Sequence, residues 1–280
     1  MSYSYLKVWY NHGMRLLVFS DLHYADKEHY EPRGRKLSQY AEELMNRLKD
    51  QANKNIKPDA CVFLGDYIED TGDSDINAKL LRRALSFFEG FTMPCFVVPG
   101  NHEFKVLDRN EVAKIMDVQY LTYSIDFMGY HLVFLGLGVD EEKQEKRGFV
   151  SRSRFICDED LDWLKKDLSC HRVPTIIFCH YGIADDDDMK NNYWFGENND
   201  LALLDNRAEL KKILKSSDTV KCVFSGHQHW TKHLVEDEID YYVVGSLVED
   251  VDGNGKPDGV FFVVDIDNGA IKITEQHLTI

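Results

Sequence analysis

Short apolar runs that stop abruptly at polar residues recur along the first part of this chain. Residues 15–20, 59–64 and 95–99 are such runs, and each is rich in β-branched and aromatic side chains. Runs of this length and composition are typical of buried β-strands. Because helical patterns separate them, the sequence predicts an α/β fold.

Between these strands, apolar residues recur at helical spacing. An amphipathic helix is expected over about residues 36–53, and a second helix follows an N-cap offered by residues 73–75. In the second half of the chain, Asp158 is expected to cap another helix, and residues 210–214 belong to a further one.

The middle and the end of the chain add antiparallel patterns. Residues 120–126 and 131–137 flank a turn at 127–130 and predict a hairpin, whereas the charged residues 140–154 predict a loop. Further strands are expected at 175–179, 222–225, 231–235, 239–245, 259–266 and 270–278, with a turn at 267–269. No linker rich in Gly, Ser or Pro interrupts the chain, so residues 1–280, tail strands included, are interpreted as a single domain.

Composition adds two bounds to this picture. With 280 residues, of which 44% are hydrophobic and 12% aromatic, the chain can bury a sizeable core. Its 48 acidic residues outnumber the 33 basic ones and give a formal net charge of −15. This charge repels a phosphate backbone, so a nucleic-acid polymer is not expected as a partner, whereas a small anionic substrate is compatible with local cations.

Cysteine usage and hydropathy bear on the compartment. The six cysteines form no C-x-x-C pair, and we expect reduced, buried and mostly inert thiols. Residues 1–11 lack the features of a signal peptide, and no apolar run approaches the roughly 18 residues of a membrane span. The sequence therefore predicts a cytoplasmic protein that does not bind a membrane, and it leaves the oligomeric state open.

The strand ends carry the candidate chemistry. Carboxylate, amide and imidazole groups follow five of the predicted strands: Asp21, His23, Asp66, Asn101, His102, His180, His227 and His229. One such residue alone is most often an ordinary loop residue, but open α/β sheets bind ligands at the carboxyl ends of their strands. The joint placement of these groups therefore favours a metal site with nitrogen and oxygen ligands.

The order of these motifs resembles that of the calcineurin-like metallophosphoesterase family. The family blocks D-x-H, G-D, G-N-H-[DE], H and G-H-x-H correspond to Asp21-x-His23, Gly65-Asp66, residues 100–103, His180 and residues 226–229. The resemblance covers roughly residues 15–265. It implies a four-layer α/β sandwich of two mixed β-sheets flanked by helices, with a dinuclear metal site at the strand ends.

The family pattern also implies how the ligands divide between two ions. It assigns Asp21, His23, Asp66 and His229 to the first ion, and Asp66, Asn101, His180 and His227 to the second. Asp66 would bridge the pair. The set contains no thiolate, which favours two divalent or mixed-valence ions of manganese, iron or zinc over calcium.

The catalytic expectation concerns His102 and Glu69. The resemblance implies that His102 binds no metal and lies near the leaving-group oxygen, where it can donate a proton. Three residues after the bridging aspartate, purple acid phosphatases carry a metal-binding tyrosine, and this chain has Glu69. Glu69 is interpreted either as the residue that orients His102 or as an exposed loop carboxylate.

The resemblance implies a hydrolase of phosphoric esters. We expect a phosphoesterase that cleaves a small phosphodiester or nucleotide-like substrate by attack of a hydroxide that bridges the ions. Alternatives are a phosphomonoesterase, a nucleotide-diphosphate pyrophosphatase, or a non-catalytic scaffold on the same fold. The intact ligand set argues against the scaffold.

Residues 181–205 predict a long loop of the kind that forms lids or binding surfaces. The acidic residues 185–188 within it are interpreted as solvated. Five aromatic residues lie next to or soon after candidate ligands: Tyr24, Tyr181, Tyr193, Trp194 and Phe195. They are interpreted either as a stacking surface for a base or aromatic leaving group, or as packing that holds the loop on the domain.

Overall fold

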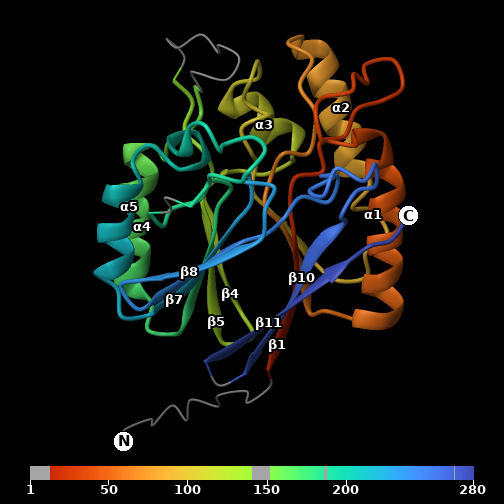
Figure 1. Ribbon diagram of the computed structural model, residues 1–280. Helices are drawn as coiled ribbons and strands as arrows, with labels where there is room; N and C mark the ends of the chain where they lie inside the picture. Colours follow the sequence, from red (N-terminus) through yellow and green to blue (C-terminus); the bar gives the residue numbers. More distant parts are fainter. Residues whose placement is uncertain (1–12, 141–151, 186–187, 268) are drawn as a thin grey trace, which may run out of the picture.

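Two β-sheets form the centre of the computed structural model, which describes residues 13–140, 152–185, 188–267 and 269–280 (Figure 1). The first sheet has the order β11 (Ala270–His277), β10 (Val260–Asp267), β1 (Met14–Phe19), β2 (Ala60–Phe63) and β3 (Cys95–Val97). The second has the order β4 (Tyr123–Phe127), β5 (Tyr130–Phe134), β6 (Thr175–Phe178), β7 (Val220–Ser225), β9 (Ile239–Val243) and β8 (Lys232–Glu236).

Both sheets are mixed. In the first, β1, β2 and β3 are parallel, and the tail strand β10 pairs antiparallel with β1. In the second, β5, β6, β7 and β9 are parallel, whereas β4 and β8 are antiparallel edge strands. The predicted fold class is therefore confirmed, and the tail strands belong to both sheets.

The sheet residues bury side chains on both faces. Leu16 and Val18 of β1 join the apolar core shared by the two sheets, while Leu17 and Phe19 join the cluster on the helical side. In the shared core, Phe178 stacks between Phe134 and Phe224 from its neighbouring strands. A strand covered on both faces needs apolar residues at every position, which explains the continuous apolar runs in the sequence.

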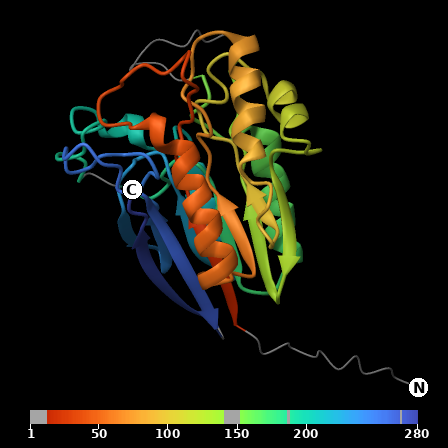
Figure 2. The same cartoon turned by 90° about the vertical axis from the view of Figure 1, so that its right-hand side faces the viewer.

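Helices cover the outer faces of the sheets. The helices of the described residues are α1 (Ala41–Gln51), α2 (Ser74–Ser86), α3 (Arg109–Ile115), α4 (Asp158–Cys170) and α5 (Arg207–Lys215), and the short helices η1 (Ser38–Tyr40), η2 (Ala52–Ile56) and η3 (Asn199–Ala202). Helices α1 and α2 lie on one side of the strands and α4 and α5 on the other, and Figure 2 looks onto the α1 side. This arrangement is the expected four-layer sandwich.

The helix expectations hold with two differences. Asp73 caps α2 as predicted, since its side chain accepts a hydrogen bond from the Ile76 backbone N–H. Asp158 does not cap α4 but is its first residue, and Cys157 occupies the N-cap position. Helix α3 was not expected, because its seven residues are too few to show a helical period.

The remaining expectations concern thiols, membrane spans and particular segments. All six cysteines are free thiols, but only Cys61, Cys179 and Cys222 are buried, and the expectation of a buried thiol is wrong for the exposed Cys170. Within the described ranges, no helix has both the length and the apolar character needed to cross a membrane. The expectations for residues 1–11, the loop 140–154, the acidic run 185–188 and the turn 267–269 lie wholly or partly outside the described residues.

Candidate metal centre

The carboxyl ends of five strands bring the candidate ligands together. Asp21 and His23 follow β1, Asp66 follows β2, Asn101 follows β3, His180 follows β6, and His227 and His229 follow β7. These polar side chains are buried, and none of the seven residues is more than 8% exposed. Polar groups are buried in this way only when they are paired or bind a metal.

Most of these residues adopt an unusual backbone conformation. The φ angle is positive at Asp21 (54°), His23 (43°), Asp66 (58°), His227 (66°) and His229 (54°). A left-handed conformation costs a non-glycine residue on the order of 1–3 kcal/mol, and such residues cluster at functional sites. Here the conformation turns the side chains away from the strand direction and into one cluster.

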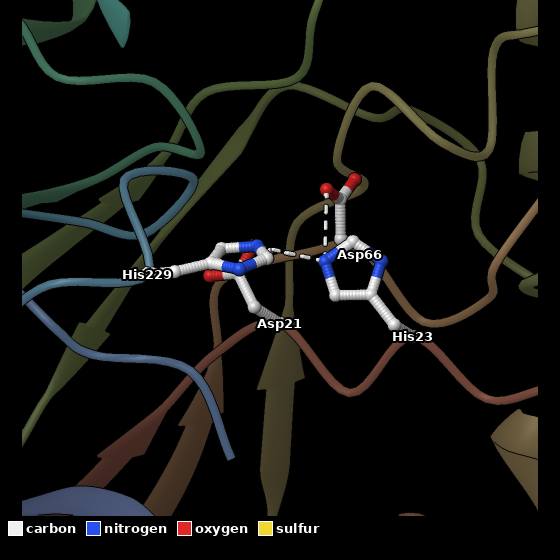
Figure 3. Close-up of side chains that lie close together, drawn as sticks. All are labelled: Asp21, His23, Asp66 and His229. Carbon is white, nitrogen blue, oxygen red and sulfur yellow. Dashed lines mark hydrogen bonds and ion pairs between the residues drawn. The ribbon is translucent and has the colours of Figure 1, made fainter. Parts of the chain in front are cut away.

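The first group of ligand candidates consists of Asp21, His23, Asp66 and His229, whose ligand atoms all lie within 4.8 Å of one another (Figure 3). His23 Nε2 lies 2.8 Å from His229 Nε2 and 3.7 Å from a carboxylate oxygen of Asp66. His229 Nε2 lies 3.2 Å from Asp21 Oδ1. This is the set that the family pattern assigns to the first ion.

The second group shares Asp66 with the first. Asp66, His180 and His227 offer ligand atoms within the same 4.8 Å limit. His180 Nε2 lies 3.3 Å from Asp66 Oδ2 and 3.1 Å from Asn101 Oδ1. Asp66 Oδ2 therefore lies between the two groups, which is the position that a bridging carboxylate requires.

Hydrogen bonds outside the cluster fix which ring nitrogen faces inward. His229 Nδ1 lies 2.7 Å from Glu249 Oε2, His180 Nδ1 lies 2.8 Å from the Leu64 carbonyl, and His227 Nε2 lies 3.1 Å from the Leu201 carbonyl. Carboxylates and carbonyls only accept, so these nitrogens carry the proton. The other nitrogen of each ring then offers a lone pair, as metal-ligating histidines do.

These residues fit a pair of divalent ions. The Nε2 atoms of His23 and His229 lie 2.8 Å apart, a distance at which one donates a hydrogen bond to the other or both face a single cation. Asp21 Oδ1 is also buried and accepts no hydrogen bond from the described residues. Both observations are expected of atoms arranged to coordinate a metal.

The electrostatics of the cluster favour ionised carboxylates. Burial alone would raise the pKa of Asp66, but His180, His102 and His23 hold that pKa well below its usual range. Burial alone would lower the pKa of His229, but the Asp21 carboxylate raises it to about 10. In the absence of a metal, the Asp21 carboxylate thus stabilises a proton on His229 Nε2, and a cation that displaced this proton would be stabilised by the same carboxylate.

His102 lies beside the two groups. Its ring meets the His23 ring edge-on with centroids 4.6 Å apart, and its Nε2 lies 3.9 Å from Asp66 Oδ2. On the other side, His102 Nδ1 lies 3.3 Å from Asp70 Oδ2 and 3.9 Å from Glu69 Oε2. Asp70 is therefore the nearer carboxylate to His102.

Glu69 is buried at 5% exposure, so the alternative of an exposed loop carboxylate is wrong. Its oxygens accept hydrogen bonds from Arg33 at 2.7 Å and Lys36 at 2.5 Å. Its Oε2 also lies 3.2 Å from His23 Nδ1. Glu69 thus contacts a ligand candidate more closely than it contacts His102, and its role in orienting His102 stays a prediction.

Glu103 is fully buried, and the sequence motif assigns it no role. Its carboxylate accepts backbone N–H groups from Gly100 at 2.7 Å, Asp66 at 3.1 Å and Tyr67 at 2.8 Å. Burial, followed by the charge of Asp66, raises the pKa of Glu103 to about 7. We call this arrangement the loop clamp, because one side chain ties together the loops that carry Asp66 and Asn101.

No pattern in the sequence points to Glu249, yet this residue contacts the ligand candidate His229. It holds His229 Nδ1 through Oε2 and accepts the indole N–H of Trp194 at 2.9 Å through Oε1. In Glu249→Gln, a neutral amide would replace the carboxylate that accepts a hydrogen bond from His229 Nδ1. We expect affinity for the first ion to fall by about 10–100-fold, the usual effect of removing an outer-shell partner.

Competition with a chelator during Zn²⁺ titration would measure this affinity. Glu89→Gln is the matched control, because Glu89 is exposed on the loop after α2. Unchanged Zn²⁺ affinity in a folded Glu249→Gln protein would contradict the role given to Glu249.

Comparisons with known proteins agree with this geometry. A family profile described as calcineurin-like phosphoesterase matches residues 14–231. A protein from Pseudoalteromonas sp. (strain SM9913), named "Probable cyclic nucleotide phosphodiesterase", is 26% identical over 202 residues, covering 72% of this chain and 67% of that protein.

Solved structures share the fold at lower identity. A dimetal phosphatase from Danio rerio superposes with a TM-score of 0.73 at 16% identity, covering 94% of this chain and 96% of its own. A purple acid phosphatase from yellow lupin (Lupinus luteus) seeds superposes with a TM-score of 0.61 at 11% identity, covering 95% of this chain and 52% of its own.

Proposed function

Because the chain belongs to the calcineurin-like phosphoesterase family and is a hydrolase of phosphoric esters, we propose that it cleaves a small phosphodiester or nucleotide-like substrate. The observation that carries the proposal is the shared position of Asp66 between two buried groups of ligand candidates. The curated relative named as a cyclic nucleotide phosphodiesterase supports the preference for a diester.

The proposed roles follow the two groups. Asp21, His23, Asp66 and His229 would hold one ion of manganese, iron or zinc, and Asp66, Asn101, His180 and His227 would hold the other. Bound there, two such ions would polarise the phosphoryl oxygens and lower the pKa of a water molecule so that it becomes a nucleophile. The buried ionised carboxylates keep the ligand set in its coordinating form.

His102 is the proposed general acid. Asp70 at 3.3 Å can accept from Nδ1 and thereby turn Nε2 toward Asp66, which lies 3.9 Å away. An N–H at Nε2 is then placed to donate a proton to a leaving-group oxygen beside the metal centre. The side chain of His102 is 14% exposed, so a substrate can reach it.

A substrate panel tests the proposal. The protein would be assayed with added Mn²⁺ on bis-p-nitrophenyl phosphate, p-nitrophenyl phosphate, cyclic nucleotides and a nucleotide sugar. We expect diesters to have the highest kcat/KM. Preferential cleavage of the monoester or of the nucleotide sugar would replace the diester proposal, and no cleavage with both ions bound would refute it.

A further inference from the structure

A pocket of about 100 Å³ lies directly beside the first ligand group. His229 and Glu249 form its inner wall, so the pocket adjoins the metal centre itself. Tyr193 and Trp194 from the long loop, together with Trp230 after β7, supply aromatic walls. A group attached to a phosphoryl oxygen at the metals could therefore enter this pocket without leaving the site.

The five aromatic residues near the candidate ligands differ in their surroundings: Tyr24, Tyr181, Tyr193, Trp194 and Phe195. Tyr24 is 8% and Tyr181 2% exposed, so both pack in the interior. Phe195 packs on the His227 ring with centroids 5.0 Å apart. By contrast, Tyr193 is 54% exposed, although it lines the pocket. The exposed part of the Tyr193 ring offers a surface on which a planar group can stack.

Arg35 and Trp194 hold the Tyr193 ring in place. The Arg35 guanidinium lies over it, 4.9 Å from the ring centroid, and the Trp194 ring meets it edge-on at 4.8 Å. Trp194 is itself fixed by its hydrogen bond to Glu249. A tyrosine and a guanidinium arranged in this way form a platform on which planar rings stack.

The pocket also has polar residues in its lining. Asn191, Asn192 and Gln228 line it beside the aromatic side chains. A stacking surface next to amide and peptide groups suits the ring face and the polar edge of a nucleobase.

The pocket is smaller than a closed cavity for one ring. Benzene occupies an engineered cavity of about 150 Å³, whereas this open pocket measures about 100 Å³, so a single ring would enter it with part of the ring left outside the opening. We propose that this pocket is the base subsite of the enzyme and that it takes the nucleobase of a substrate whose phosphoryl group lies at the metal centre. This proposal rests on the proposed function of a nucleotide-directed phosphoesterase.

Nucleoside binding tests the subsite apart from hydrolysis. The full-length, Zn²⁺-loaded protein would be titrated with adenosine, cytidine and ribose while tryptophan fluorescence is recorded, because Trp194 and Trp230 line the pocket. We expect saturable quenching by at least one nucleoside and none by ribose. Tyr193→Ala should weaken nucleoside binding at least tenfold, whereas Tyr120→Ala, with a tyrosine 64% exposed outside the pocket, should not change it.

Failure of the subsite is distinguishable from failure of the proposed function. Absence of nucleoside quenching, or equal binding by wild type and a folded Tyr193→Ala protein, would overturn the base subsite even if diesters are hydrolysed. A second readout is the ratio of kcat/KM for a cyclic nucleotide to kcat/KM for glycerophosphoethanolamine, which carries no ring. We expect Tyr193→Ala to lower this ratio at least tenfold, and an unchanged ratio would contradict the proposal.

Discussion

Asp66→Asn is expected to abolish two-metal occupancy and to lower kcat at least about 10³-fold, equivalent to about 4 kcal/mol of transition-state stabilisation. Asp66 Oδ2 lies 3.7 Å from His23 Nε2 and 3.3 Å from His180 Nε2, between the two groups. A neutral amide there removes the negative charge that offsets repulsion between two closely spaced dications. The second ion should be lost first, because its remaining ligands carry no charge.

Metal analysis of the dialysed protein, together with turnover of an aryl diester, measures both effects. Asp117→Asn is a matched control, since Asp117 has a φ of 54° against 58° at Asp66 and is exposed. The control separates the loss of a bridging charge from the effect of placing an asparagine in a left-handed conformation. Two ions per chain in a folded Asp66→Asn protein would refute the bridging role.

His102→Ala is expected to keep both ions and to lower kcat by about 10²–10⁴-fold, the usual contribution of a general acid. The loss should be smaller for esters with acidic leaving groups, which depart without protonation. Measurements of kcat on aryl phosphodiesters of graded leaving-group pKa test this expectation. A loss that is the same for every leaving group would argue for a role other than proton donation.

Two further variants decide which carboxylate orients His102. Asp70→Asn should reproduce part of the kcat loss without loss of metal, because Asp70 lies 3.3 Å from His102 Nδ1. Glu69→Gln should chiefly weaken metal binding, because Glu69 lies closer to His23 than to His102. The reverse pattern, with kcat lost and both ions retained only in Glu69→Gln, would return the orienting role to Glu69.

The fold could be predicted from the sequence because the residues that favour strands locally are also the residues that the sheets bury on both faces. Strands buried on both faces need uninterrupted apolar residues, and each ends where the chain must present a polar group. Asp21, Asp66 and His180 could therefore be placed at one edge of the sheets from the sequence alone. The short α3 escaped notice because its seven residues are too few to show a helical period, although the sequence contains the residues of its capping box, Asp108 and Glu111.

The outer contacts of the site could not be predicted, since they depend on packing between distant segments. Glu249 is 20 positions from His229 along the chain, and no spacing rule connects them. The choice between Glu69 and Asp70 depends on the backbone path after Asp66, where Ile68 forms a β-bridge with Tyr24, because this path decides which of two consecutive carboxylates faces His102. In the loop from 181 to 205, composition alone could not separate packed aromatic rings from the exposed Tyr193.

The loop clamp at Glu103 bears on how the enzyme acquires its metals. Four backbone N–H groups converge on this one carboxylate, from Gly100, Asp66, Tyr67 and Ile68. The loops that carry Asp66 and Asn101 are thus ordered during folding, and the conformational entropy of that ordering is not lost again when an ion enters. Ion uptake should then be limited by shedding of the ion's own hydration water, so that slowly dehydrating cations load slowly into a site that is already shaped to receive them.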